Sequence, residues 1–424
     1  MTVSVAAPSR AVVASTASLR NVYVGALAFW LATRWLVLVH QGAWPWMNAF
    51  VVTAARGIVV GDWNEAVRPQ LPAVLGVPLV LAGATEQQMV AALYLLASLV
   101  QFGAFLVLLR TVFPAKLEEQ TLGLLVFLVV PFNHSIHHYR DMPVVLASAA
   151  IFLLAADFVR HGAGGRLSVP RALGLCAIML LGVWSRIEMV TFVGVLILVA
   201  LVVWRRRAFH IALTYAAAVV AVTASLLVVY QLEDVNLNQA WFYTAHTFLD
   251  STPDSWLSPA CQADPTENCR EADGLTYFGP ADLHAGVLAL ALNHPLTTIA
   301  KSARSAWDNA WVLVGPNLST FPGTVPFVML ALALLRPARE LYRQVPTSVW
   351  IVVAAVAAES VLPPLTWAPP HPQYHVALVL PIVLLLVPVL VALMRLPRGR
   401  LLAFGFLVAN AGLSAFRYTR YPGY

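Results

Sequence analysis

The chain has 424 residues, of which 60% are apolar and only 11% are charged, and its mean hydropathy is +0.76. Soluble globular proteins carry about 25% charged residues, so this composition excludes a chain of soluble domains and indicates a polytopic membrane protein. The net charge is +6, but no basic stretch is interleaved with aromatic residues as in nucleic-acid-binding surfaces. We therefore expect no nucleic-acid partner.

The N-terminal region predicts a signal anchor. Residues 1–19 are small and polar, and the first apolar run, Val22 to Val39, has no small-residue cleavage site before Trp44. Apolar runs of about 20 residues, the length that crosses a bilayer, then recur along the chain. We expect an all-α fold with about eleven transmembrane helices, at 22–40, 89–110, 119–136, 142–159, 172–186, 187–204, 209–230, 310–335, 347–364, 374–394 and 401–417.

Lysine and arginine predict how these helices are oriented. If the N-terminus is inside, the basic residues of the short loops are cytoplasmic, apart from Arg417 and Arg420, as the positive-inside rule requires. The acidic stretch from Glu233 to Asp282 then lies outside. We therefore expect an integral protein of the plasma membrane with an extracytoplasmic active face.

The chain is predicted to divide into three parts. They are an N-terminal membrane region (1–230) with a first external loop (41–88) and a site cluster (134–143), an extracytoplasmic loop region (231–309) and a C-terminal membrane region (310–424).

The first external loop holds two apolar runs that are too short to span comfortably. They extend from Ala49 to Val60 and from Pro72 to Leu81, and prolines interrupt the second. We expect both to form helices that lie in the membrane interface. Arg56 and Arg68 flank these helices, and they either reach lipid head groups or meet a pyrophosphate.

Residues 134–143 form a cluster of ionisable side chains between two apolar runs, with His137, His138, Arg140 and Asp141 among them. Polar groups at a membrane face cost several kcal/mol unless they meet water, partners or substrate, so we predict a functional site. Alternatively, Asp141 only caps the helix that follows it. A divalent metal is a further alternative, because positions i and i+4 share a helix face; apart from that metal, we expect no cofactor.

The three cysteines differ in their surroundings. Cys176 lies inside a predicted span, whereas Cys261 and Cys269 lie in the long polar loop. In an oxidising exterior the last two either close a disulfide or remain free thiols, and both alternatives stay open.

Several short motifs occur in the order and spacing typical of one family of membrane enzymes. They are Ala54–Trp63 followed by Arg68–Leu71, then Tyr139–Pro143, Trp184–Glu188, Asn293–Pro295, and Gln373–His375 before residues 376–381. In these segments the chain resembles the GT-C superfamily of membrane glycosyltransferases, in particular the branch of protein O-mannosyltransferases and lipid A aminoarabinose transferases.

The resemblance implies a GT-C-like fold and an activity. The expected reaction transfers a monosaccharide from a polyprenyl-phosphate donor to a cell-envelope glycan, lipid or protein, so the expected partners are the lipid-linked sugar and membrane lipid. It also implies substrate-binding roles for Arg186, Glu188, Tyr374 and His375. As outer-face charges, Arg186 and Glu188 are alternatively structural, and His375 stands where the family has an arginine.

One departure from the family pattern concerns the catalytic base. The family's first-loop acid aligns with Trp46 or Met47, and neither side chain accepts a proton. Sugar transfer to a hydroxyl needs such a base. The base is therefore expected at Asp141, Asp62 or Glu65. Otherwise the chain is a non-catalytic GT-C-like protein that binds lipid-linked saccharide or scaffolds an envelope-assembly complex.

Overall fold

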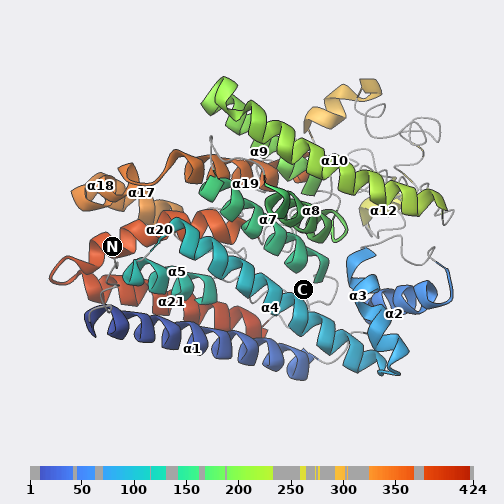
Figure 1. Ribbon diagram of the computed structural model, residues 1–424, viewed down its shortest axis with the longest axis horizontal. Helices are drawn as coiled ribbons and strands as arrows, with labels where there is room; N and C mark the ends of the chain where they lie inside the picture. Colours follow the sequence, from blue (N-terminus) through green and yellow to red (C-terminus); the bar gives the residue numbers. More distant parts are fainter. Residues whose placement is uncertain are drawn as a thin grey trace, which may run out of the picture.

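The computed structural model describes most of the predicted membrane regions. The described residues are 10–41, 45–62, 70–114, 116–129, 142–161, 168–186, 189–232, 258–263, 273, 276, 292–300, 303, 324–366 and 377–420. Throughout these residues the regular structure is helical, which confirms the all-α prediction (Figure 1). Most of the predicted loop region 231–309 lies outside the described residues.

A helix occurs within each of the eleven segments predicted to span the membrane. The helices are α1 (Arg10–Gln41), α2 (Pro45–Val59), α3 (Gln70–Leu81), α4 (Glu86–Val112), α5 (Leu117–Val129), α7 (Met142–His161), α8 (Val169–Val183), α9 (Met189–Trp204), η4 (Arg205–Ala208), α10 (Phe209–Leu232), α12 (Pro259–Ala263), α17 (Thr324–Leu334), α18 (Arg336–Arg343), α19 (Thr347–Thr366), α20 (Val379–Met394) and α21 (Gly399–Arg420). The two apolar runs of the first loop form α2 and α3, as predicted.

Length and hydropathy identify an integral membrane protein. Three described helical stretches are long and apolar enough to cross a bilayer, namely α4, α7 and Met189–Val229. A fourth exists if α18 and the start of α19, which are bent by 96°, form one span. Several shorter apolar helices accompany them, so the number of eleven crossings remains a prediction.

The stretch Met189–Val229 contains a turn between α9 and α10. Arg205 has a φ of +51°, a left-handed conformation that interrupts a helix. The ring of Phe158 in α7 lies 5.3 Å from that of Trp204 and 6.2 Å from that of Tyr215, measured between centroids. Because residues on both sides of the turn contact one ring, α9 and α10 form the two arms of a hairpin.

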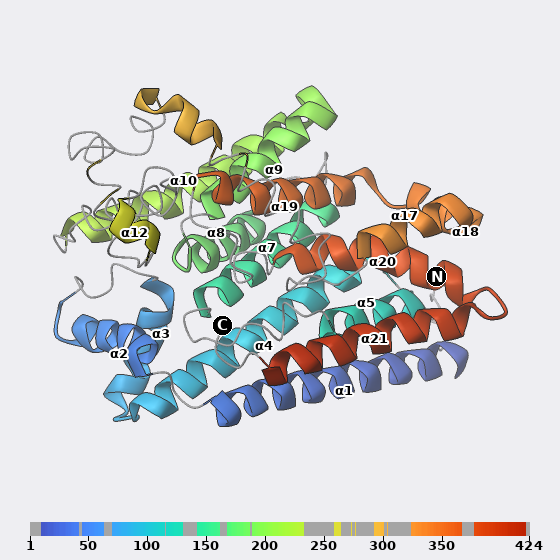
Figure 2. The same ribbon diagram turned by 180° about the vertical axis from the view of Figure 1, so that it is seen from behind.

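The core of the bundle is aromatic and aliphatic. α4 packs along α7, α20 packs against α5, and α19 packs against α9 (Figures 1 and 2). Phe127 of α5 stacks on Phe105 of α4 at 4.1 Å and contacts Trp30 of α1 at 4.9 Å. α20 is buried on nearly all sides, as expected for a helix that is apolar all round.

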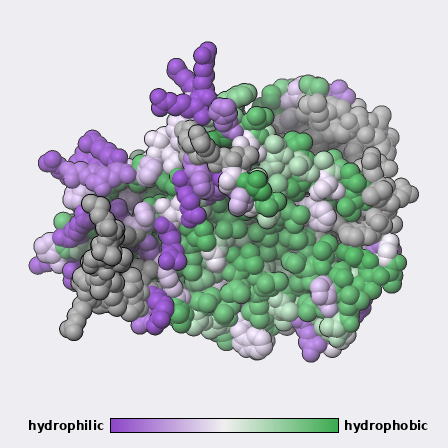
Figure 3. Space-filling view, viewed as in Figure 1, coloured by the Kyte–Doolittle hydropathy of each residue, from purple (hydrophilic) through white to green (hydrophobic). Residues whose placement is uncertain are grey.

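The surface of the bundle is polar mainly at one end. Hydrophilic residues gather where α18 and the α9–α10 turn lie, and a broad apolar surface covers the middle of the molecule (Figure 3). Three arginines in η4 and three in α18 belong to this end, which we call the basic end. α2, α3 and α12 lie at the opposite end (Figure 1). Exposed apolar side chains on α10 and α21 fit a surface that faces lipid.

Candidate functional site

Segments that carry three of the sequence motifs meet at the end of the bundle opposite the basic end. A single apolar cluster, here called the α2–α3 cluster, contains Ala55 of α2, Leu71 of α3 and Met142, the first residue of α7. Trp184, which follows α8, packs against the same cluster. The Leu71 N–H also donates to the Trp184 carbonyl at 2.9 Å, so the first loop is joined directly to the α8–α9 junction.

Two glycines allow these segments to approach closely. A Cβ at Gly76 in α3 would lie 3.0 Å from the Ala55 Cβ and 3.2 Å from the Met89 Cε, so α3 lies tightly against α2 and α4. A Cβ at Gly182 in α8 would lie 2.6 Å from the Met189 Cγ and 3.1 Å from the Ala150 Cβ. The end of α8 is therefore held against α7 and the start of α9, which fixes the position of the Trp184–Arg186 junction.

The Gly61-Asp62 motif ends α2. Gly61 has a φ of +82°, its N–H donates to the Ile58 carbonyl at 3.2 Å, and the Asp62 N–H donates to the Gly57 carbonyl at 2.8 Å. This is the Schellman arrangement, which satisfies the last carbonyls of a helix. The motif thus has a structural role in ending α2, and the Asp62 side chain is exposed.

Three of the predicted site residues are described, and all lie on segments at this end. Arg56 is exposed in the last turn of α2, Asp62 is exposed just after it, and Arg186 is half-buried between α8 and α9. The others lie outside the described residues, so their positions remain predictions: Glu65, Arg68, His137, His138, Arg140, Asp141, Glu188, Tyr374 and His375.

Sequence analysis missed Arg34, a buried arginine in α1. Its side chain is 1% exposed, its guanidinium carbon lies 3.8 Å from the centroid of the Trp30 ring, and its Nη1 donates to the Tyr94 hydroxyl at 3.3 Å. Tyr94 belongs to the α2–α3 cluster. The signal was available, because an arginine inside an apolar run of membrane length is a default candidate for a functional residue.

Several polar atoms near this end have unused hydrogen-bonding capacity. Nε and Nη2 of Arg34, Nε1 of Trp184 and Oγ of Ser185 are buried and lack a hydrogen-bond partner within the described part of the chain. Buried polar groups of this kind normally meet a partner, a water or a bound molecule. These unsatisfied donors lie on α1 and on the Trp184–Arg186 junction, next to the α2–α3 cluster.

A metal site is not found within the described ranges, where no three His, Cys, Asp or Glu residues lie close together. The predicted metal alternative involves His137, His138 and Asp141, which lie outside those ranges. It remains a prediction. Cys261 in α12 is disulfide-bonded and Cys176 is a free thiol, whereas Cys269 is outside the described residues.

Comparison with known proteins adds no relative. No family model, no curated protein and no solved structure matches this chain.

Proposed function

We propose that the chain transfers a monosaccharide from a polyprenyl-phosphate donor to a cell-envelope glycan, lipid or protein acceptor at the extracytoplasmic face of the membrane. The proposal includes a GT-C-like fold with about eleven transmembrane helices. The observation that carries it is the α2–α3 cluster, because the first-loop helices, the start of α7 and the Trp184–Arg186 junction all contribute to it.

The chemistry of the reaction accounts for the residue types at this end. A carboxylate must take the proton of the acceptor hydroxyl as its oxygen attacks the sugar, and cations must stabilise the departing phosphate. Asp141 directly precedes the buried Met142, and Asp62 follows α2. Arg56 and Arg186 are the described cations on the same segments. In the proposed reaction, Asp141 or Asp62 would take the proton, and Arg56 and Arg186 would stabilise the phosphate.

The basic end supports an extracytoplasmic position for this site. Arginines are retained on the cytoplasmic side, and the arginines of η4 and α18 lie at the end opposite α2 and α3. The disulfide at Cys261 in α12 favours an oxidising compartment on the other side. Both observations support the same orientation.

Cysteine labelling tests this orientation. In a Cys176→Ala background, a cysteine at Glu267 should react with a membrane-impermeant maleimide in intact cells, because it is expected outside. A cysteine at Arg206 should react only after permeabilisation, because positively charged loops stay inside. Labelling of both positions from the same side would refute the predicted topology.

Activity is tested with the purified full-length protein in vesicles that contain radiolabelled polyprenyl-phosphate sugars. The expected result is transfer of label to an envelope acceptor. Glu340→Gln is the matched control, because the Glu340 side chain is exposed on α18 at the basic end, and it should leave transfer unchanged. If donors of several sugar types bind without any transfer, the catalytic proposal fails.

A non-catalytic function is the second candidate, and one observation favours it. Trp46 and Met47 occupy the positions where the family has its catalytic acid, so the first loop lacks the usual base. Such a protein would bind lipid-linked saccharide or scaffold an envelope-assembly complex. Saturable donor binding that survives Asp141→Asn, Asp62→Asn and Glu65→Gln, with no transfer by the unmodified chain, would identify it.

A further inference from the structure

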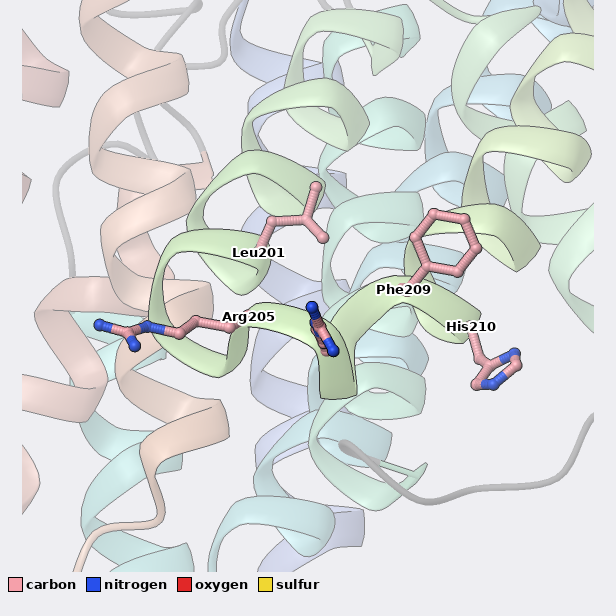
Figure 4. A pocket seen from close by; sticks show the side chains of 5 residues that line it. Leu201, Arg205, Phe209 and His210 are labelled. Atoms are coloured by element: carbon pink, nitrogen blue, oxygen red, sulfur yellow. The ribbon is translucent and has the colours of Figure 1, made fainter.

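A pocket of about 520 Å³ lies at the turn between α9 and α10, at the basic end of the bundle. Its lining consists of Leu201, Arg205, Arg206, Phe209 and His210. Figure 4 shows Leu201 on one arm of the hairpin, Phe209 and His210 on the other, and Arg205 at the turn. The pocket thus combines two permanent cations and an imidazole with two apolar side chains.

Contacts on both sides of the turn fix its geometry. Trp204 stacks on Phe158 with an interplanar angle of 9°, and the hydroxyl of Tyr215 donates to Asp157 at 2.5 Å. Between these anchors Arg205 adopts its positive φ, which a residue other than glycine keeps only where the surrounding structure imposes it. The anchored turn therefore holds the backbone of Arg205 and Arg206 at the end of the hairpin, and the Arg205 side chain extends to the side away from Phe209 and His210 (Figure 4).

The surroundings of the pocket indicate what kind of molecule occupies it. No carboxylate is among the lining residues, so the two guanidinium groups are left to attract an anion. On the arms next to the turn, apolar side chains are exposed, with Val202 at 70%, Phe209 at 62% and Leu213 at 60%. Apolar side chains that are exposed on a membrane-spanning hairpin face acyl chains. A soluble anion would use only the arginines, whereas a phospholipid would use both the arginines and the apolar arms.

We propose that this pocket binds the phosphate of an anionic phospholipid in the leaflet at the basic end. Arg205 and Arg206 contact the phosphate, and Leu201 and Phe209 contact the first part of the acyl chains. Basic pockets between membrane helices are suited to such head groups. The site is separate from the α2–α3 cluster and does not depend on the proposed transferase activity.

Arg207 provides a matched control for charge. It belongs to the same short helix, carries the same charge and is exposed, but it does not line the pocket. A general attraction of the turn to an anionic membrane would depend on all three arginines equally. Binding of the phosphate in the pocket itself would depend on Arg205 and Arg206 only.

The test is lipid retention by the full-length protein. The protein is reconstituted in vesicles of phosphatidylcholine and phosphatidylglycerol, extracted in mild detergent, and its bound lipids are counted by native mass spectrometry. The unmodified protein should retain phosphatidylglycerol selectively. Arg205→Gln with Arg206→Gln should weaken that retention about thirtyfold, from the usual contribution of two arginines near a phosphate. Arg207→Gln should change retention by less than the about fivefold that one arginine near a phosphate contributes, because Arg207 does not line the pocket.

A second variant distinguishes loss of lipid binding from misfolding of the turn. Arg205→Gly with Arg206→Gln removes both charges and places at position 205 the residue that adopts positive φ most readily, so the turn is kept. It should lose retention to the same extent. Unchanged retention in both double variants, or an equal loss in Arg207→Gln, would overturn the proposal. Displacement of the lipid by millimolar inorganic phosphate would also overturn it, because the site would then be one for a soluble anion.

Discussion

Asp141→Asn should lower the rate of sugar transfer by a factor on the order of 10²–10⁴, the usual contribution of a general base. The substitution keeps the shape of the side chain and removes only its charge and proton affinity. Asp141 directly precedes Met142 in the sequence, and Met142 is a buried member of the α2–α3 cluster, which the first-loop helices and Trp184 share. Initial rates of transfer in reconstituted vesicles measure the effect.

Stability separates this chemical role from a capping role. An amide caps a helix about as well as a carboxylate, so Asp141→Asn should leave membrane insertion and the thermal unfolding midpoint nearly unchanged. Asp141→Ala removes both functions and should also destabilise the start of α7. A loss of transfer that appears only in the alanine variant would assign Asp141 to capping alone.

Variants of the other two candidate carboxylates, Asp62 and Glu65, test which residue is the base. Asp62→Asn and Glu65→Gln should retain most of the transfer if Asp141 is the base. The Asp62 backbone N–H, which helps to end α2, is unaffected by the side-chain change. Full transfer in Asp141→Asn together with its loss in Asp62→Asn or Glu65→Gln would move the base into the first loop.

The helices could be predicted from the sequence because the bilayer fixes their length and polarity. Each predicted membrane segment contains a helix, and α4 and α7 agree with their predicted bounds within a few residues. The two short runs of the first loop also form helices. The pattern of apolar runs carries this information along the chain, and no contact between distant residues is needed to interpret it.

The side-chain contacts that position the candidate site could not be predicted in this way. The bond between Leu71 and Trp184 joins residues far apart in sequence, and it depends on the rotation of α3 and α8 about their axes. Nor does the sequence show that Arg34 is enclosed by Trp30 and Tyr94. An apolar run reveals which helix crosses the membrane but not which face meets a given neighbour, so partners across helices remain undetermined.

The same limitation applies to Asp157, which links three helices. Sequence analysis assigned no role to this residue near the end of α7. In the structure, Arg171 at the start of α8 donates Nε to Oδ1 at 3.1 Å and Nη2 to Oδ2 at 2.9 Å. The Tyr215 hydroxyl of α10 donates to Oδ2 at 2.5 Å, and Nδ1 of His161 lies 2.8 Å from Oδ1. One carboxylate thus holds α7, α8 and α10 together.

Asp157→Asn should therefore lower the free energy of unfolding by about 1.5–3 kcal/mol, less than for a fully buried ion pair, because this pair is half-buried. The Asp157 side chain is 13% exposed and that of Arg171 is 10% exposed, so the guanidinium left behind is largely shielded from water. Unfolding of the detergent-solubilised protein, followed by circular dichroism, measures the loss. Glu340→Gln removes an exposed partner of Arg336 and should cost less than about 1 kcal/mol.

A double variant distinguishes loss of the charge pair from loss of packing. In Asp157→Asn the half-buried Arg171 charge has lost its counter-charge, and most of the expected destabilisation comes from that charge. Arg171→Met in the same chain removes the charge and keeps an unbranched apolar side chain, so it should recover part of the stability lost in Asp157→Asn. If the double variant is instead less stable than Asp157→Asn by the full cost of Arg171→Met alone, the two residues act independently, and the carboxylate does not hold the three helices through this pair.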